Sequence, residues 1–402
     1  MAEPTRLLKT PNVRWYLGGL VLSLLASTAL TLVAGIWVKT LTGSSSLAAL
    51  ATFCAWLPQL LAPAIGVAVD RVRRRALLVA TNLAMVPVLA PLLLVRGPDE
   101  TWMIFIVMAL YGVSFTLIGA AEPALLASML EPGQLGRVNG LRMSLQEGMK
   151  LVAPLIGAGL FGLAGGPAVA ATCMLCFAAA AGLTARIRVR EAGPAGARAS
   201  WRSEMAAGLR HLAARPAVRS LVAGCSVVML AFGFIEAAAY SLVADGLHRP
   251  PQFLGVVAAL TGAGTIAGGL LAPRVMARLG EPRLTAAGVF VFAAGAALLS
   301  TGRLPAVVAG AVLNGAGVPW LVIGVITFIQ RTTPTALLGR VLATVNALLF
   351  TPTTLGIAIG AGLVSVLSYR TLLLTITGIT LCAGAYLIRT LPAPPSPTEP
   401  PS

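Results

Sequence analysis

Charge is scarce in this chain: only 10% of its 402 residues are Asp, Glu, Lys or Arg, where soluble domains carry about 25%. Histidine is scarcer still, with two residues, whereas 57% of the chain is hydrophobic. This composition excludes a water-soluble fold. Two histidines and scattered carboxylates also give no grouped set of side chains for a membrane-embedded enzyme, and no Gly-rich nucleotide-binding segment ending in Lys and Ser or Thr is present.

Cysteine is also rare, and all five cysteines lie in apolar stretches, so no disulfide framework on an aqueous face is predicted. Cys173 and Cys176 form a CxxC pair without a second pair or a nearby histidine, and we interpret them as small packing residues. The sequence therefore predicts neither a metal site nor a cofactor.

Long uncharged stretches take the place of the missing charge. A membrane-spanning helix needs about 20 apolar residues to cross roughly 30 Å of hydrocarbon, and twelve stretches meet that requirement. We therefore predict an all-α polytopic membrane protein with spans at residues 15–38, 47–69, 76–95, 101–128, 138–163, 167–185, 217–243, 252–273, 284–301, 304–330, 341–367 and 371–388.

The basic residues are unevenly distributed among the predicted connections. The chain has 29 Lys and Arg against 13 Asp and Glu, a formal net charge of +16. With the N-terminus placed in the cytoplasm, 23 basic residues fall on the inner side and 5 on the outer side. Because Lys and Arg near helix ends are retained on the cytoplasmic side, we predict that both termini are cytoplasmic. This distribution also excludes a nucleic-acid binder, which gathers basic residues on one exposed face.

The two halves of the chain resemble each other. Residues 135–138 (LGRV) recur as residues 338–341 at an offset of 203, and 156–160 recur as 359–363 at the same offset. Near the start of each half the offset is 205, where Pro11 and Gly19 match Pro216 and Gly224. Several matches in one register indicate a duplicated six-helix unit.

This repeat divides the chain into four predicted parts. An N-terminal six-helix bundle covers residues 1–188, and a C-terminal bundle covers 216–390. The linker 189–215 has helical spacing after Ser200, a plausible N-cap, so it is expected to hold an interfacial helix. Residues 391–402 are Pro-rich and are expected to be a disordered cytoplasmic tail.

The connection between the second and third predicted spans carries the most informative motif, formed by Gly66, Asp70, Arg71, Arg74 and Arg75. Gly66 would allow close helix approach, and Asp70 would face a positive helix end or an arginine. The arginines would hold a gate on the cytoplasmic side and contact lipid headgroups. The spacing resembles the signature loop of the major facilitator superfamily, Gly-x-x-x-Asp-Arg-x-x-Arg-Arg. The resemblance implies two pseudo-symmetric six-helix bundles with a cavity that opens to each side in turn. A plain cluster of inner-side arginines is the alternative.

The resemblance also implies a partner for this loop. In the family the loop stabilises the outward-facing state through the start of the eleventh span, here near Gly339 and Arg340. The second half keeps the loop only in part, as Gly269, Arg274 and Arg278, with proline in place of the aspartate. We therefore expect an asymmetric switch.

The fifth predicted span contains Gly148, Pro154, Gly157 and Gly159. These residues resemble the Gly-Pro-x-x-Gly-Gly motif of exporters in the superfamily, with two glycines replaced by alanine and Gly148 one residue off the usual spacing. Small residues allow close packing and proline loosens the helix, as a rocking interface requires. Ordinary helix packing explains the same residues equally well.

Charged residues inside spans are functional candidates because they are costly there. Glu236 has no basic residue within a helical turn, and it could bind a proton, attract a cationic substrate or face water in an outer vestibule. Glu147 and Lys150 are three residues apart and either neutralise each other or serve the cavity. Glu122 is expected to have a structural role. The fourth predicted span lacks the arginine that many proton-coupled exporters of the family carry.

The cavity is predicted to be mostly apolar, with candidate contacts at Asn314, Asn346, Trp15, Trp37, Phe232, Tyr240 and Trp320. A cavity poor in charge suits amphipathic or hydrophobic compounds better than phosphates or dicarboxylates. We therefore predict a monomeric secondary active transporter in the cell membrane of a bacterium. It would export a drug, antibiotic or siderophore-like compound, with membrane lipids as partners and protons as a candidate coupling ion. An uptake permease is the alternative within the family, and a non-transporting sensor or a membrane enzyme is the alternative outside it.

Overall fold

The computed structural model describes residues 10–69, 72–130, 132–189 and 201–390. Asp70, Arg71, part of the linker and the tail 391–402 lie outside these ranges. In chain order the elements are α2 (Pro11–Thr42), α3 (Ser45–Trp56), η1 (Leu57–Leu61), α4 (Ala62–Val69), α5 (Arg74–Leu89), η2 (Ala90–Leu94), η3 (Pro98–Glu100), α6 (Thr101–Met129), α7 (Pro132–Ala185), α8 (Trp201–Ala213), α9 (Pro216–Ser241), η4 (Leu242–Gly246), η5 (Pro251–Phe253), α10 (Leu254–Leu279), α11 (Glu281–Leu299), α12 (Leu304–Thr332), α13 (Thr335–Leu363) and α14 (Tyr369–Thr390).

Ten helices within the described ranges are long and apolar enough to cross a membrane, against the twelve spans predicted. The 54-residue α7 accounts for one difference. It would be about 81 Å long at 1.5 Å per residue, far more than one crossing needs. Its backbone leaves helical geometry at Gly165 (φ 76°), so α7 contains the fifth and sixth predicted spans. The second predicted span is divided among α3, η1 and α4, which leaves a shorter apolar helix, Ser45–Leu61.

Local sequence signals set the ends of the first helices. Pro11 and Pro216 occupy the first turns of α2 and α9, where a missing N–H costs nothing. Gly43 ends α2 in the left-handed conformation (φ 70°), and its N–H donates to the Lys39 carbonyl. Ser44 then caps α3 by accepting a hydrogen bond from the Leu47 N–H at 3.2 Å.

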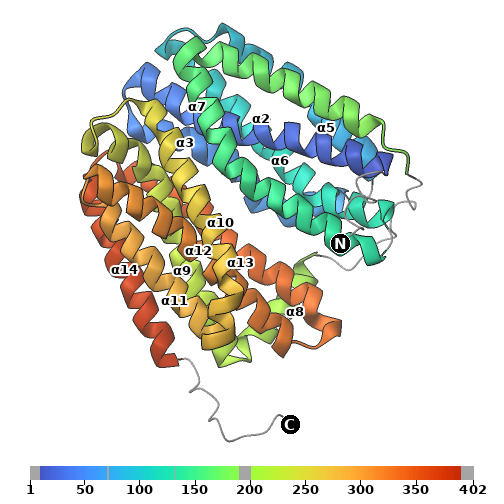
Figure 1. The fold of residues 1–402 in the computed structure, drawn as a ribbon, viewed down its shortest axis with the longest axis vertical. Helices are drawn as coiled ribbons and strands as arrows, with labels where there is room; N and C mark the ends of the chain where they lie inside the picture. Colours follow the sequence, from blue (N-terminus) through green and yellow to red (C-terminus); the bar gives the residue numbers. More distant parts are fainter. Residues whose placement is uncertain (1–9, 70–71, 131, 190–200, 391–402) are drawn as a thin grey trace, which may run out of the picture.

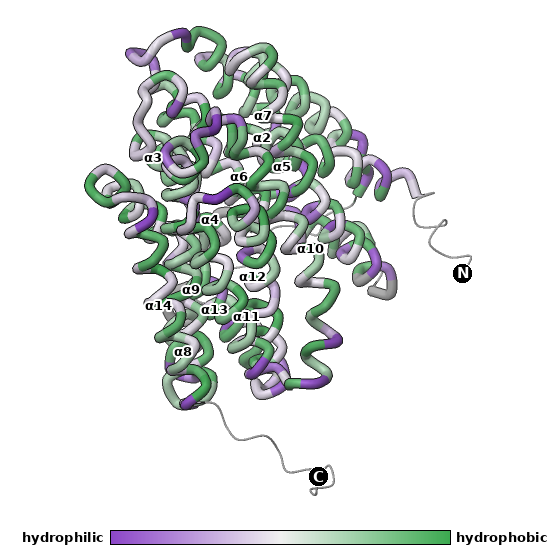
Figure 2. Tube along the Cα trace, turned by 60° about the vertical axis from the view of Figure 1, so that its left-hand side comes forward, coloured by the Kyte–Doolittle hydropathy of each residue, from purple (hydrophilic) through white to green (hydrophobic). Residues whose placement is uncertain are grey.

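The exposed faces of the helices are apolar along most of each helix. Leu61, Leu163, Leu175 and Leu270 are between 63% and 90% exposed. Figure 2 shows hydrophobic residues along most of each helix and hydrophilic residues mainly near helix ends and connections. A helix that is hydrophobic all round needs an apolar environment, so the protein is a multi-pass membrane protein.

The two halves repeat their internal contacts. Gly19 of α2 lies against Thr184 of α7, where an added Cβ would be 3.0 Å from the hydroxyl oxygen. Its counterpart Gly224 of α9 lies against Leu387 of α14, where an added Cβ would be 2.8 Å from the side chain. Equivalent glycines thus bring equivalent helices together, as the offset of 205 residues predicts.

The helices form two groups that meet at one end. In Figure 1 the N-terminal group (α2–α7) lies above the C-terminal group (α9–α14). One buried hydrophobic cluster contains residues of both groups, including Ile36, Trp37, Tyr240 and Leu254. These residues lie in the parts of the helices far from Pro11 and from the end of α14. We call this side the closed end and the opposite side the terminal end.

The terminal end is organised differently. There the N-terminal group has its own cluster around Tyr16, Leu125 and Val138. The C-terminal group has a separate cluster, to which Leu212 of α8 and Leu387 of α14 belong. The described part of the chain therefore has a shared core at the closed end and separate cores toward the terminal end.

Candidate functional site

The signature loop lies at the terminal end, between α4 and α5. Gly66 is half-buried in α4, and an added Cβ would meet no atom of the described residues within 4 Å. The close approach expected at Gly66 stays a prediction. Arg74 and Arg75 begin α5, and the Arg75 guanidinium donates a hydrogen bond to the Ala185 carbonyl at the end of α7. Arg75 thereby connects two helices of the N-terminal group.

The start of α13, the predicted partner of that loop, contacts the linker helix α8 in this structure. Gly339 and Arg340 are exposed, and an added Cβ at Gly339 would meet nothing within 4 Å. Gly208 of α8 packs against Thr344, where an added Cβ would be 2.9 Å from the Thr344 Cβ and 3.0 Å from the Arg340 carbonyl oxygen. Helix α8 therefore docks on the first turns of α13 (Figure 1).

The second-half counterpart of the loop has few contacts. Arg274 and Arg278 are exposed, and Gly269 has open space around it. The close approach between α10 and α12 occurs at Gly264 and Gly268 instead, each against an α12 backbone carbonyl. Among the described residues, Gly264 and Gly268 therefore pack closely on α12, whereas Gly269, the glycine that the repeat matches with Gly66, does not.

The predicted packing motif of α7 is used in part. Gly157 lies against Ala29 of α2, where an added Cβ would be 2.9 Å from the alanine Cβ. Pro154 contributes its carbonyl to the approach of Gly255 of α10, whose added Cβ would be 2.8 Å from that oxygen. Gly148 and Gly159, in contrast, have open space. Pro154 and Gly157 therefore sit where α7 meets both groups.

Charged side chains inside spans form two ion pairs. Lys150 Nζ lies 2.7 Å from Glu147 Oε1, and the two side chains are 52% and 32% exposed. Structural pairing, one of the two alternatives, is what this structure contains. Arg142 of α7 reaches Glu122 of α6 at 3.4 Å, with side-chain exposures of 20% and 10%. Glu122, for which a structural role is expected, thus has a partner in Arg142, one of the 23 basic residues counted on the inner side.

Glu236 of α9 differs from these carboxylates. It is half-buried, and its carboxylate has no hydrogen bond or ion pair within the described ranges. Tyr240 follows one turn later on the same helix face. An unpaired carboxylate in an apolar span can bind a proton or a cationic group.

The closed end brings both groups into direct contact around Tyr240. Its hydroxyl lies 3.0 Å from the Thr52 hydroxyl of α3, and either oxygen can donate. Nearby, the Ser46 hydroxyl of α3 donates to the Ala361 carbonyl of α13 at 2.5 Å. The sequence placed Tyr240 among cavity contacts, but no pattern in it indicated Thr52 or Ser46, because a contact between groups depends on how the groups dock.

The other predicted cavity contacts mostly pack within the groups. Asn314 is 2% exposed inside the C-terminal group, and its side-chain nitrogen has no hydrogen-bond partner in the described part. Asn346 is exposed. The remaining aromatic residues contact neighbouring helices: Trp37 against Phe161 at 6.4 Å, Phe232 against Phe292 at 6.4 Å, and Trp320, whose indole donates to the Gly268 carbonyl at 2.8 Å.

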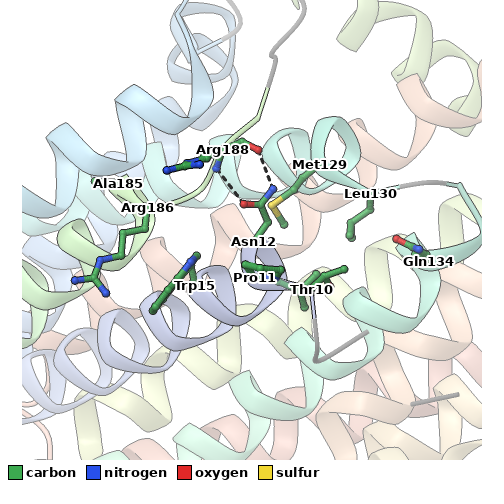
Figure 3. A pocket seen from close by; sticks show the side chains of 11 residues that line it. Thr10, Pro11, Asn12, Trp15, Met129, Leu130, Gln134, Ala185, Arg186 and Arg188 are labelled. Carbon is green, nitrogen blue, oxygen red and sulfur yellow. Dashed lines mark hydrogen bonds between the residues drawn. The ribbon is translucent and has the colours of Figure 1, made fainter. Parts of the chain in front are cut away.

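A cavity of about 880 Å³ lies at the terminal end of the N-terminal group. Figure 3 shows Asn12 in this cavity, paired with the Arg188 backbone through an N–H donated at 2.8 Å and one accepted at 3.0 Å. The Arg186 guanidinium lies 4.9 Å from the centre of the Trp15 ring. These contacts tie the start of α2 to the segment after α7.

Neither cysteines nor metal ligands form a site in the described part of the chain. Its cysteines are free, and Cys173 is a buried packing residue whose thiol lies 3.6 Å from the Ala26 carbonyl. No group of three or more His, Cys, Asp or Glu that could hold a metal is found there.

Comparisons with known proteins identify the fold. A family model described as Major Facilitator Superfamily matches residues 16–248 and 222–402. No curated protein sequence matches the chain. The structure of the nucleoside transporter NupG is similar at a TM-score of 0.74 and 11% identity, over 95% of this chain and 99% of that chain.

Two structures of a bacterial homologue of the iron transporter ferroportin are also similar. The inward-facing structure matches at a TM-score of 0.71 and 14% identity, over 94% of this chain and 98% of that chain. The outward-facing structure matches at 0.62 and 17% identity, over 94% and 98%. At these identities the likeness establishes the fold alone.

Proposed function

The chain belongs to the Major Facilitator Superfamily, and from this premise we propose that it is a secondary active transporter that exports a small amphipathic or hydrophobic compound by alternating access. One observation carries the proposal. In the described part of the chain, the two helix groups share a core at one end only, and the carboxylate of Glu236, which has no partner there, lies one turn from the contact that joins the groups. A solute between the groups is then reached from the terminal end and blocked at the closed end.

The proposed topology has twelve crossings and both termini in the cytoplasm. The two halves of α7 count as separate crossings, and α3, η1 and α4 together count as one. The excess of basic residues toward the terminal end supports this orientation. With it, the terminal end faces the cytoplasm and the structure is inward-facing. The higher TM-score with the inward-facing ferroportin homologue supports the same state.

Glu236 is the proposed binding site for a proton or a cationic group of the substrate. Glu147 and Glu122 each have a cationic partner at 2.7 Å and 3.4 Å, whereas Glu236 has none within the described ranges. An ionised carboxylate without a counter-charge in an apolar region is costly. Binding a proton or an organic cation removes that cost, so the occupied and empty states differ in energy, as coupling requires.

Export, rather than uptake, is supported by the motif around Pro154 and Gly157. These residues lie where α7 contacts α2 and α10, so the exporter-like motif forms part of the interface along which the groups would move. We further propose that the protein is a monomer in a bacterial cell membrane.

Flux in proteoliposomes tests this function. A lipophilic fluorescent cation and a neutral lipophilic dye are followed with and without an imposed pH gradient. We expect the gradient to accelerate movement of at least one dye in wild-type vesicles and to have no effect with Glu236→Gln. Asp99→Asn, at an exposed residue of η3 at the closed end, is the matched control and should behave as wild type. Equal responses of Glu236→Gln and wild type would remove Glu236 from the coupling site.

Dye accumulation in cells determines the direction of transport. An exporter lowers the dye content of expressing cells relative to cells without the protein, whereas an uptake permease raises it. A transport-active protein that raises dye content would overturn the export proposal.

A further inference from the structure

Tyr240 reaches from one helix group into the other. Its side chain is 6% exposed although it lies on α9 of the C-terminal group, because α2 and α3 of the N-terminal group enclose it. Its hydroxyl lies 3.0 Å from Thr52 Oγ1. Tyr240 therefore has both a packing contact and a polar contact across the closed end.

Gly35 of α2 leaves the space that the tyrosine ring fills. A Cβ added at Gly35 would lie 2.5 Å from Tyr240 Cζ and 2.8 Å from Cε1, with the hydroxyl oxygen nearer still. Atoms do not approach so closely without displacement, and a rigid ring packed on three helices has little freedom to move. In this arrangement only glycine fits at position 35.

The repeat gives this pair a special position. The offset of 205 that matches Pro11 with Pro216 and Gly19 with Gly224 also matches Gly35 with Tyr240. Two positions that a pseudo-two-fold axis exchanges can touch only if both lie near that axis. On the axis two tyrosines would collide and two glycines would leave a void, whereas one of each fills the space.

The position of the pair relative to Glu236 completes the argument. Glu236 lies four residues before Tyr240, one turn toward the terminal end on the same helix face. A solute held at Glu236 therefore meets the Tyr240 ring next on its way to the closed end. Rotation of one group against the other about a point nearer the terminal end must withdraw Tyr240 from Gly35 and break its contact with Thr52.

We propose that packing of the Tyr240 ring against Gly35 holds the two helix groups together at the closed end. We call this contact the latch. This one asymmetric pair on the pseudo-two-fold axis determines whether the closed end can close. The inference rests on the proposed alternating-access function. Tyr240 acts as a positioning residue here, because it holds two helix groups together and need not touch the substrate.

Distance measurements between spin labels test the latch without any substrate. One label pair is placed at the closed end on Arg96 and Arg303, and another at the terminal end on Arg14 and Arg219; all four side chains are exposed. The labels are attached to introduced cysteines after the five native cysteines are replaced. Because this readout needs no transported compound, it remains informative even if the flux experiment fails.

Gly35→Ala is expected to lengthen the closed-end distance and shorten the terminal-end distance. The added methyl overlaps the Tyr240 ring, so the ratio of closed to open molecules should fall by about tenfold or more. Gly119→Ala is the matched control, because a Cβ at Gly119 has open space, and it should give wild-type distances.

The decisive comparison uses Tyr240→Ala as a second background. If Gly35→Ala acts because its methyl group overlaps the Tyr240 ring, it should cause no further change in the label distances in the Tyr240→Ala background. An equal effect of Gly35→Ala with and without Tyr240 would overturn the latch, as would wild-type distances in well-folded Gly35→Ala protein.

Discussion

Gly157 of α7 and Gly360 of α13 occupy equivalent positions in the repeat and make equivalent contacts. An added Cβ at Gly157 would lie 2.9 Å from the Cβ and 3.1 Å from the Cα of Ala29 of α2. One at Gly360 would lie 3.4 Å from the Cα of Phe234 of α9, the residue 205 positions after Ala29, and 2.8 Å from the Cβ of Ala237 one turn later. The offsets of 203 and 205 residues found in the sequence thus describe one packing arrangement used twice.

Alanine at either of these two glycines should destabilise the protein by a similar amount. We expect each substitution to cost about 1–3 kcal/mol, because the neighbouring alanine must move away. Thermal unfolding in detergent, followed by tryptophan fluorescence, measures the loss. Gly362→Ala, where the structure has open space, should leave the midpoint unchanged. A stable Gly360→Ala beside an unstable Gly157→Ala would contradict the equivalence.

Removing one member of the ion pair between Glu122 and Arg142 should destabilise the protein more than removing both members. Arg142→Leu leaves a carboxylate that is 90% buried without its partner, and such a loss typically costs about 3–5 kcal/mol. The double variant Glu122→Leu, Arg142→Leu should recover most of this stability. The monodisperse fraction after heating measures both effects. Arg331→Leu, which breaks a pair whose arginine is 71% exposed, should have a much smaller effect.

Asp70 is predicted to act on transport rather than on folding. Its place in the signature motif leads us to expect that Asp70→Asn inserts and purifies normally but transports poorly. Membrane content by immunoblot and flux in vesicles measure the two properties separately. A well-expressed Asp70→Asn protein with normal flux would remove the aspartate from the gate.

Docking of α8 on α13 should depend on the absence of a side chain at Gly208. An added Cβ there meets both Thr344 and the Arg340 carbonyl oxygen, so Gly208→Leu should lift α8 away from α13. Limited proteolysis is then expected to cut within residues 201–213 faster than in wild type. Gly378→Ala, in α14 with open space, provides the control, and unchanged cleavage in Gly208→Leu would contradict the docking.

The architecture was largely predictable from the sequence because its causes are local. Apolar runs, prolines at helix starts such as Pro11, and the repeat around Gly157 are visible without coordinates. The single element α7 covers two predicted spans, which meet at Gly165, where the backbone leaves helical geometry.

The site was less predictable because its contacts join distant elements. Glu236 stood out as a lone charge, but the fit between Tyr240 and Gly35 depends on how the two groups dock. Arg142 near a helix end resembled any other inner-side arginine, and only its approach to Glu122 reveals a buried pair.

The shared hydrophobic cluster at the closed end has a consequence for biosynthesis. The α2 and α3 residues of this cluster are made before Tyr240 and Leu254, so the first half of the chain is inserted with an apolar face that nothing from the second half yet covers. This face contacts lipid until the second half arrives. The two halves produced as separate polypeptides should therefore find each other through this surface, without the linker to guide them.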